Sequence, residues 1–137
     1  SYVHEVALAV KQVEPQLYPA VCRALYAAYD AGKFTDEDTW SKSRADIYED
    51  LLDVVAGAGV ERSLYPAMLS NTGSGTPMTQ ALKWAVKYHR TRSVHITPTV
   101  FVNGLEAGVV SSGWKADQWS AFLGPMGADN WQGSKLE

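Results

Sequence analysis

The chain contains few side chains that could do chemistry: one cysteine and three histidines, with no pair of these at a catalytic or metal-binding spacing. Cys22 lies in an apolar helical stretch. We expect it to fill space in the core, since a reactive thiol needs an electropositive and partly exposed setting. One cysteine and three scattered histidines predict no metal site, because zinc-type sites place their ligands at fixed spacings. A dithiol–disulfide cycle needs two thiols, so we expect no catalytic residue for that reaction within these 137 residues.

The segment over residues 94–104, Val-His-Ile-Thr-Pro-Thr-Val-Phe-Val-Asn-Gly, is the most informative in the chain. Proline is rare inside strands because it has no amide hydrogen for the ladder. Pro98 between β-branched residues therefore predicts a cis bond after Thr97 at the start of a strand, the alternative being a trans bond in a simple turn. The Asn-Gly pair supplies the positive φ angles of a two-residue hairpin turn, so residues 105–109 should form the return strand.

This order of proline bend, strand, hairpin and strand, followed by a short helix over residues 112–123, resembles the C-terminal half of a thioredoxin fold. The segment above, together with the later Ser-Ser-Gly-Trp and Gln-Trp, resembles eukaryotic members of the DsbA-like thioredoxin family. The resemblance extends from about Tyr2 to Leu123, because the helical stretch before the hairpin is similar to the helical domain that this family inserts into the thioredoxin scaffold. It implies an α/β fold, in the broad sense that includes α+β, that is mostly helical with a cis-proline hairpin.

The resemblance also implies a site. Thr97, Pro98 and Thr99 would form the substrate-facing edge, offering backbone hydrogen bonds to an extended protein or peptide substrate. His95 and His4 would be candidates for lining the cleft, since the family carries a His-Glu pair near the position of His4. For both histidines, a structural role with a hydrogen bond to the backbone is the simpler expectation.

Three functions follow from the resemblance as expectations. The first is a protein related to thiol–disulfide oxidoreductases, seen here without a Cys-x-x-Cys motif. The second is a non-catalytic domain that keeps the fold and binds a peptide or protein. The third is an enzyme similar to kappa-class glutathione transferases. We expect no bound cofactor, with glutathione or a similar small molecule as the candidate ligand.

The predicted organisation has three parts. Residues 1–75 form the helical region, residues 76–123 the C-terminal thioredoxin-like part, and residues 124–137 a tail whose last five residues resemble a cloning-site remnant. No strand-like segment precedes residue 94, although a thioredoxin fold needs a βαβ unit there. Either an N-terminal piece or another chain supplies those strands, a homodimer being one arrangement; alternatively, this is a mostly helical domain with one hairpin.

Apolar spacing predicts helices over residues 2–13, 16–31, about 35–55, 61–69 and 77–92. Residues 71–75, Asn-Thr-Gly-Ser-Gly, predict a flexible linker rather than a phosphate-binding loop, since the Walker lysine is missing. A serine pair at 111 and 112 should cap the last helix. The aromatic side chains of the helical region should pack in its core, with an aromatic-lined groove as the alternative: Tyr26, Tyr29, Trp40 and Tyr48.

Composition excludes several partners. The chain is 46% hydrophobic and 20% charged with a net charge of −3, which is ordinary for a soluble domain. The absence of a basic run argues against nucleic acid. No apolar run approaches the roughly 20 residues of a membrane helix, and no signal peptide is visible. With a single cysteine, this predicts a protein of a reducing compartment, the cytoplasm.

Overall fold

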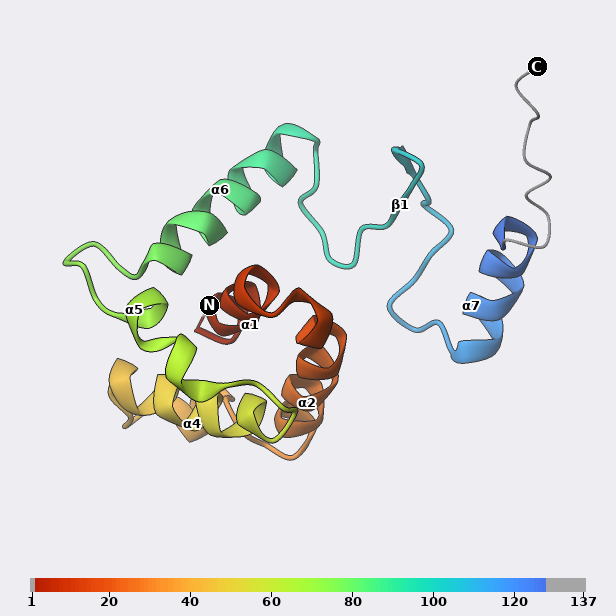
Figure 1. The fold of residues 1–137 in the computed structure, drawn as a ribbon. Helices are drawn as coiled ribbons and strands as arrows, with labels where there is room; N and C mark the ends of the chain where they lie inside the picture. Colours follow the sequence, from red (N-terminus) through yellow and green to blue (C-terminus); the bar gives the residue numbers. More distant parts are fainter. Residues whose placement is uncertain (1, 128–137) are drawn as a thin grey trace, which may run out of the picture. The chain divides into compact units, whose positions relative to one another are not determined.

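The computed structural model describes residues 2–127 and groups the chain into two compact units, divided between Tyr88 and His89. The elements of the helical unit (residues 2–88) are α1 (Tyr2–Val13), η1 (Pro15–Leu17), α2 (Tyr18–Asp30), α3 (Asp36–Thr39), α4 (Arg44–Ala56), η2 (Arg62–Leu64), α5 (Pro66–Leu69) and most of α6 (Pro77–Thr91). Those of the hairpin unit (residues 89–127) are the end of α6, β1 (Phe101–Val102), β2 (Leu105–Glu106), α7 (Ala116–Leu123) and η3 (Gly124–Met126) (Figure 1).

The core of the helical unit lies where α1, α2 and α4 pack against one another, with α5 against α1. Each helix contributes an apolar stripe at helical spacing, as the sequence predicts. Leu51 and Val55 of α4 are fully buried, as are Val6 and Val10 of α1. Burying one such side chain stabilises the fold by about 1.5–3 kcal/mol.

The helix predicted over residues 35–55 is interrupted. Thr35 caps a single short helix, α3, by accepting a hydrogen bond from the Asp38 amide at 3.2 Å. A second start then follows at Ser43, whose Oγ accepts from the Asp46 amide while the Asp46 carboxylate accepts from the Ser43 amide, a capping box. Trp40 falls in the break between the two helices and is 90% exposed, so the prediction that it packs in the core is wrong.

Within the described residues, the helix α6 is buried only near its beginning. Thr76 caps it and Pro77 occupies its first position. Met78 is its one buried residue, and Trp84 is 62% exposed. The apolar spacing that predicts this helix continues after Met78, but no later side chain of α6 is buried among the described residues.

The hairpin unit forms as predicted but with short strands. The Thr97–Pro98 bond is cis, and Asn103 and Gly104 have φ angles of 50° and 85° in the turn, both confirming predictions. Strands β1 and β2 are antiparallel, with Val102 opposite Leu105. They are two residues each, shorter than the predicted strands.

The hairpin unit has no core of its own within the described residues, since every one of its side chains from 89 to 127 is exposed or half-buried. The aromatic rings of Trp114, Trp119 and Phe122 pack edge-to-face around α7, with centroids 5.3–6.4 Å apart. The predicted serine cap of this helix is wrong: α7 begins after Lys115, whose amide donates to Gln118 Oε1 at 2.9 Å.

The described chain is thus mostly helical with one two-stranded antiparallel sheet, which confirms the coarse fold class. The predicted cloning-site remnant at residues 133–137 and most of the predicted tail lie outside the described residues, and residues 124–126 form η3.

Candidate functional site

The predicted substrate-facing edge lies in the loop that leads into β1. Thr97 and Pro98 are exposed, and Thr99 is half-buried with its hydroxyl donating to the Ile96 carbonyl. His95 is also exposed and makes no hydrogen bond within residues 2–127, so its expected bond to a backbone carbonyl is not formed there. His95 and the Thr97–Thr99 segment therefore lie in the same loop, and most of their side chains are exposed to solvent.

The backbone of β1 has an open edge. In a two-residue hairpin the pair that flanks the turn exchanges hydrogen bonds and the next pair does not. Val102 and Leu105 flank the turn, so Phe101 and Glu106 form the pair without hydrogen bonds. The next pair, Val100 and Ala107, is hydrogen-bonded again: the Ala107 amide donates to the Val100 carbonyl at 2.8 Å. The amide and carbonyl of Phe101 consequently point away from β2.

His4 lies in the helical unit, apart along the chain from the hairpin loop. It lines an open cavity of about 360 Å³ between α1 and α2 together with Val3, Ala7, Tyr18, Cys22, Leu25, Tyr26, Tyr29 and Phe34. Cys22 is half-buried in this cavity wall, so it does not fill the core as predicted. The neighbouring Cys22 thiol is the largest cause that raises the pKa of the Tyr18 hydroxyl.

The tyrosines of this cavity correct the core prediction. Tyr26 and Tyr29 are 73% and 59% exposed, whereas Tyr48 on α4 is buried as predicted. The physical reason is the position of each ring on its helix: Val21 and Leu25 form the buried stripe of α2, and the tyrosines stand beside that stripe. Tyr26 and Tyr29 instead line the open cavity between α1 and α2, which corresponds to the alternative expectation of an aromatic-lined groove.

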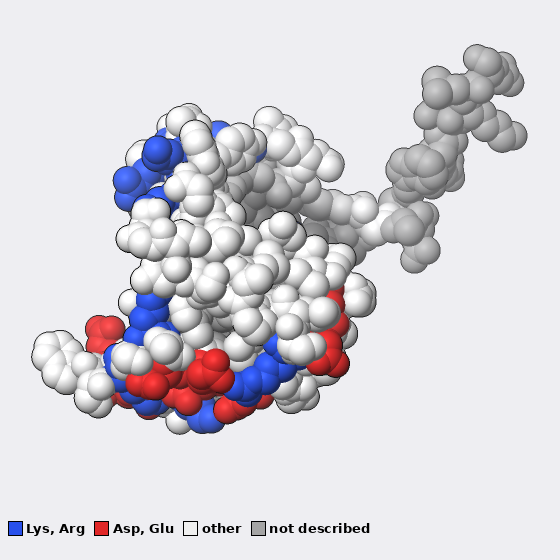
Figure 2. Space-filling model, turned by 60° about the vertical axis from the view of Figure 1, so that its left-hand side comes forward, with Lys and Arg blue, Asp and Glu red and all other residues white. Residues whose placement is uncertain are grey.

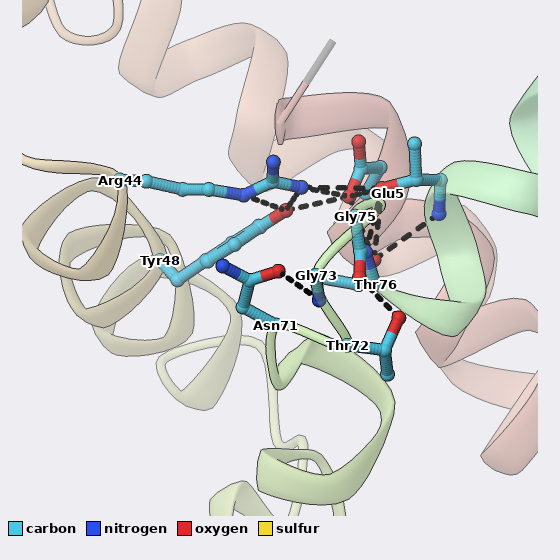
Figure 3. A network of polar contacts seen from close by, with 9 residues as sticks. Glu5, Arg44, Tyr48, Asn71, Thr72, Gly73, Gly75 and Thr76 are labelled. Atoms are coloured by element: carbon cyan, nitrogen blue, oxygen red, sulfur yellow. Dashed lines mark hydrogen bonds and ion pairs between the residues drawn. The ribbon is translucent and has the colours of Figure 1, made fainter.

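A buried carboxylate connects α1, α4 and the start of α6. Glu5 is 2% exposed, and its Oε2 accepts hydrogen bonds from the Tyr48 hydroxyl at 2.5 Å, the Thr76 and Thr79 hydroxyls at 2.9 Å each, and Arg44 Nη2 at 3.1 Å (Figure 3). A buried charge is tolerated only when it is paired and hydrogen-bonded, and this one is both. Because its donors come from α4 and from the start of α6, the carboxylate fixes both segments to α1.

The same contacts set the ionisation of Glu5. Burial raises the pKa of its carboxyl, but the hydrogen bonds from the tyrosine and the two threonines and the charge of Arg44 lower it by more, so the pKa is below its ordinary value. The guanidinium of Arg44 also contacts the rings of Tyr2 and Tyr48, at 5.1 and 5.3 Å from their centroids. Arg44 therefore stays charged and in place.

The segment predicted as a flexible linker is a hydrogen-bonded turn that presents Thr76 to Glu5. The Gly73 amide donates to Asn71 Oδ1 at 2.8 Å, and the Thr72 amide and hydroxyl both donate to the Gly75 carbonyl (Figure 3). The backbone at Gly75 has a φ of 120°, which favours glycine. This loop thus has a structural role and resembles no phosphate-binding loop.

Acidic and basic side chains interleave along one side of the helical unit (Figure 2). Lys42 lies between Asp38 and Asp50 at 3.0 and 2.9 Å, and Arg62 pairs with Glu49 and Asp53. Exposed pairs of this kind contribute about 0–1 kcal/mol each. They indicate a solvated face rather than a binding site.

Residues 2–127 contain neither a metal-binding cluster nor a membrane-spanning helix. No group of three or more histidine, cysteine, aspartate or glutamate side chains has a geometry that would hold a metal ion. No helix in this part of the chain has the length and apolar character needed to cross a bilayer.

Reasoning from the sequence did not find the Glu5 network. Its partners Arg44, Thr76 and Thr79 are 39 to 74 residues away along the chain, so spacing gives no signal for them. One signal was present: Glu5 occupies the same helical face as Ala9, four residues on, where an apolar residue is expected. A charged residue on a buried stripe indicates a buried ionic network.

The first prediction concerns pH. Glu5→Gln removes the charge that Arg44 and the hydroxyls stabilise, so the free energy of unfolding at about pH 7 should fall by about 1–3 kcal/mol. The folded-state pKa is lowered, so the wild type loses this contribution as the pH falls from about 4.3, the ordinary glutamate value, through the folded value. Urea unfolding followed by circular dichroism should show the difference between the two proteins shrinking in that range. Glu37→Gln, an exposed change on α3, should alter stability little at either pH.

The second prediction concerns the turn. A Cβ at Gly75 would lie 2.7–2.8 Å from the side chain of Thr79, whereas a Cβ at Gly73, also at positive φ, would meet nothing within 4 Å. Gly73→Ala should therefore cost about 1 kcal/mol from backbone strain alone. Gly75→Ala should cost at least about 1 kcal/mol more, since it displaces a donor to Glu5. Equal unfolding free energies of the two variants would contradict the proposed role of the turn.

Comparison with known proteins gives no relative from which a function could be transferred. The chain matches no protein-family model, no curated protein and no solved structure. What it does must be inferred from its own residues and their geometry.

Proposed function

We propose that this chain is the helical and C-terminal part of a thioredoxin-like, DsbA-like protein that binds an extended peptide at the edge of β1. The observation that carries the proposal is the outward direction of the Phe101 amide and carbonyl at the end of the exposed Thr97–Pro98 loop. Extended peptides bind sheet edges by adding a strand, with main-chain hydrogen bonds giving the affinity.

The state of the hairpin unit supports the proposal. Two-stranded hairpins are marginally stable in water, and three or more strands or a packed helix are needed for independent stability. No side chain within the described residues 89–127 is buried, and Leu105 and Ile96 are 77% and 76% exposed. An added strand would give the hairpin hydrogen-bond partners and apolar cover, which is what a strand of a larger thioredoxin-like sheet receives.

The composition of the edge also favours a strand. No lysine, arginine, aspartate or glutamate occurs from Ser93 to Leu105. Charged side chains are one of the means by which proteins protect an exposed edge from pairing with another chain. An edge without them is open to a partner strand.

The proposed activity is binding and involves no redox turnover by this chain. A dithiol–disulfide cycle needs an attacking thiol and a second thiol that resolves the mixed disulfide. Cys22 is the single thiol of the chain and lies in the helical unit, in the wall of the α1–α2 cavity. The partner would be a protein or peptide in extended conformation.

The third prediction is that this protein does not accelerate insulin reduction by dithiothreitol. The turbidity trace with wild-type protein should overlay that of the Cys22→Ser variant and that of the buffer. Turnover that Cys22→Ser abolishes would show that Cys22 is a working thiol and would contradict a binding-only role.

The fourth prediction tests the edge itself. A fluorescein-labelled peptide of about ten residues, alternating threonine and valine with terminal lysines, should bind the wild type in an anisotropy titration. Phe101→Pro removes the outward amide and should weaken binding about three- to tenfold, the value of one backbone hydrogen bond. Proline is tolerated at an edge position whose amide faces solvent, so the hairpin should persist.

Phe101→Leu is the matched control, because it removes the ring that lies 4.6 Å below the Arg92 guanidinium but keeps the amide. Its affinity should stay within about twofold of the wild type, since Phe101 contributes through its backbone. A peptide that fails to bind the wild type, or one that binds the proline variant equally well, would remove the proposed function.

A further inference from the structure

We propose that the β1 edge also pairs with the β1 strand of a second copy of this chain, in an antiparallel arrangement about a two-fold axis. The inference rests on the proposed function in one respect, that the β1 edge is the binding element. It adds a specific partner and a specific register: Phe101 lies opposite the partner's Phe101.

The direction of the backbone groups fixes this register. Phe101 presents both its amide and its carbonyl away from β2. Two antiparallel copies with these residues opposite each other exchange two N–H···O bonds, as in any hydrogen-bonded antiparallel pair. The neighbouring positions then form pairs without hydrogen bonds, so Val100 lies opposite the partner's Val102.

The side chains favour β1 over β2 as the contact. Self-pairing through the outer edge of β2 would place Glu106 opposite the partner's Glu106, and like charges directly opposite each other destabilise a sheet. Self-pairing through β1 places two aromatic rings opposite each other, which stabilises a cross-strand pair. The uncharged segment from Ser93 to Leu105 adds no repulsion on this side.

Pairing of two copies also remedies the marginal size of the hairpin. The sheet would become four-stranded, in the order β2, β1, partner β1, partner β2. Since side chains alternate between the faces of a strand, one face would combine Val100, Val102, Leu105 and Ala107 with the same residues of the partner. A sheet of this size with an apolar face reaches the range in which strands are stable. The two-fold contact is closed, so it gives a dimer rather than a fibre.

The fifth prediction is cross-linking that depends on register. In a Cys22→Ser background, a mixture of Val100→Cys and Val102→Cys proteins oxidised with diamide should form a disulfide heterodimer. Opposed Cα atoms in such a pair are about 4.5 Å apart, within disulfide reach. Either variant alone places its thiols at the diagonal spacing of about 7–8 Å and should give at least about fivefold less dimer. Differently sized tags separate the three products on a gel, and circular dichroism checks that both variants keep the helical content of the wild type.

The outcomes separate the two proposals. Cross-linking in the mixture only, with light scattering giving a dimer mass for the Cys22→Ser protein, supports the two-fold pairing. No cross-link, or equal cross-linking in all three samples, overturns it. If the labelled peptide still binds in that case, the edge accepts a strand but not from a second copy. If the peptide does not bind even at protein concentrations that light scattering shows to be monomeric, the proposed function itself fails.

Discussion

A backbone amide or carbonyl that leaves water must find a hydrogen-bond partner, and the two units of this chain meet that constraint differently. Helices satisfy it within their own segment, so the helical unit needs only caps at its ends. A strand satisfies it only through a neighbour. β1 has a neighbour on one side, and Phe101 directs its amide and carbonyl to the other. The function proposed for the hairpin unit follows from this asymmetry.

In the helical unit, the apolar side chains are packed and the buried polar groups are hydrogen-bonded. Its apolar stripes meet in one core, and its buried carboxylate has four hydrogen-bond donors. No buried side-chain polar atom within the described residues lacks a partner. Tyr65, which is fully buried, places its hydroxyl 2.6 Å from Glu14 Oε2. This unit therefore has the features of a stable scaffold, whereas the hairpin unit has those of a surface that another strand completes.

Local patterns predicted the fold where local chemistry decides it. The Asn103-Gly104 turn was predicted because it depends on residues a few positions apart. The break at Ser43 was missed because apolar spacing continues from Trp40 to Ile47, one heptad on, so periodicity alone favours a single helix. The capping box at Ser43 ends that continuity by offering the backbone a second helix start.

The candidate site was predictable only in part, and the reason is the kind of group involved. The Thr97–Thr99 segment and its exposure could be expected from composition and turn signals. Whether a backbone edge is open depends on which strands lie beside it, and no single residue of β1 carries that information. The exposure of Tyr26 and Tyr29 has the same origin, since a second stripe on a helix is buried only if another element covers it. Features of this kind depend on which elements lie beside a residue, so residue types and their spacing cannot predict them.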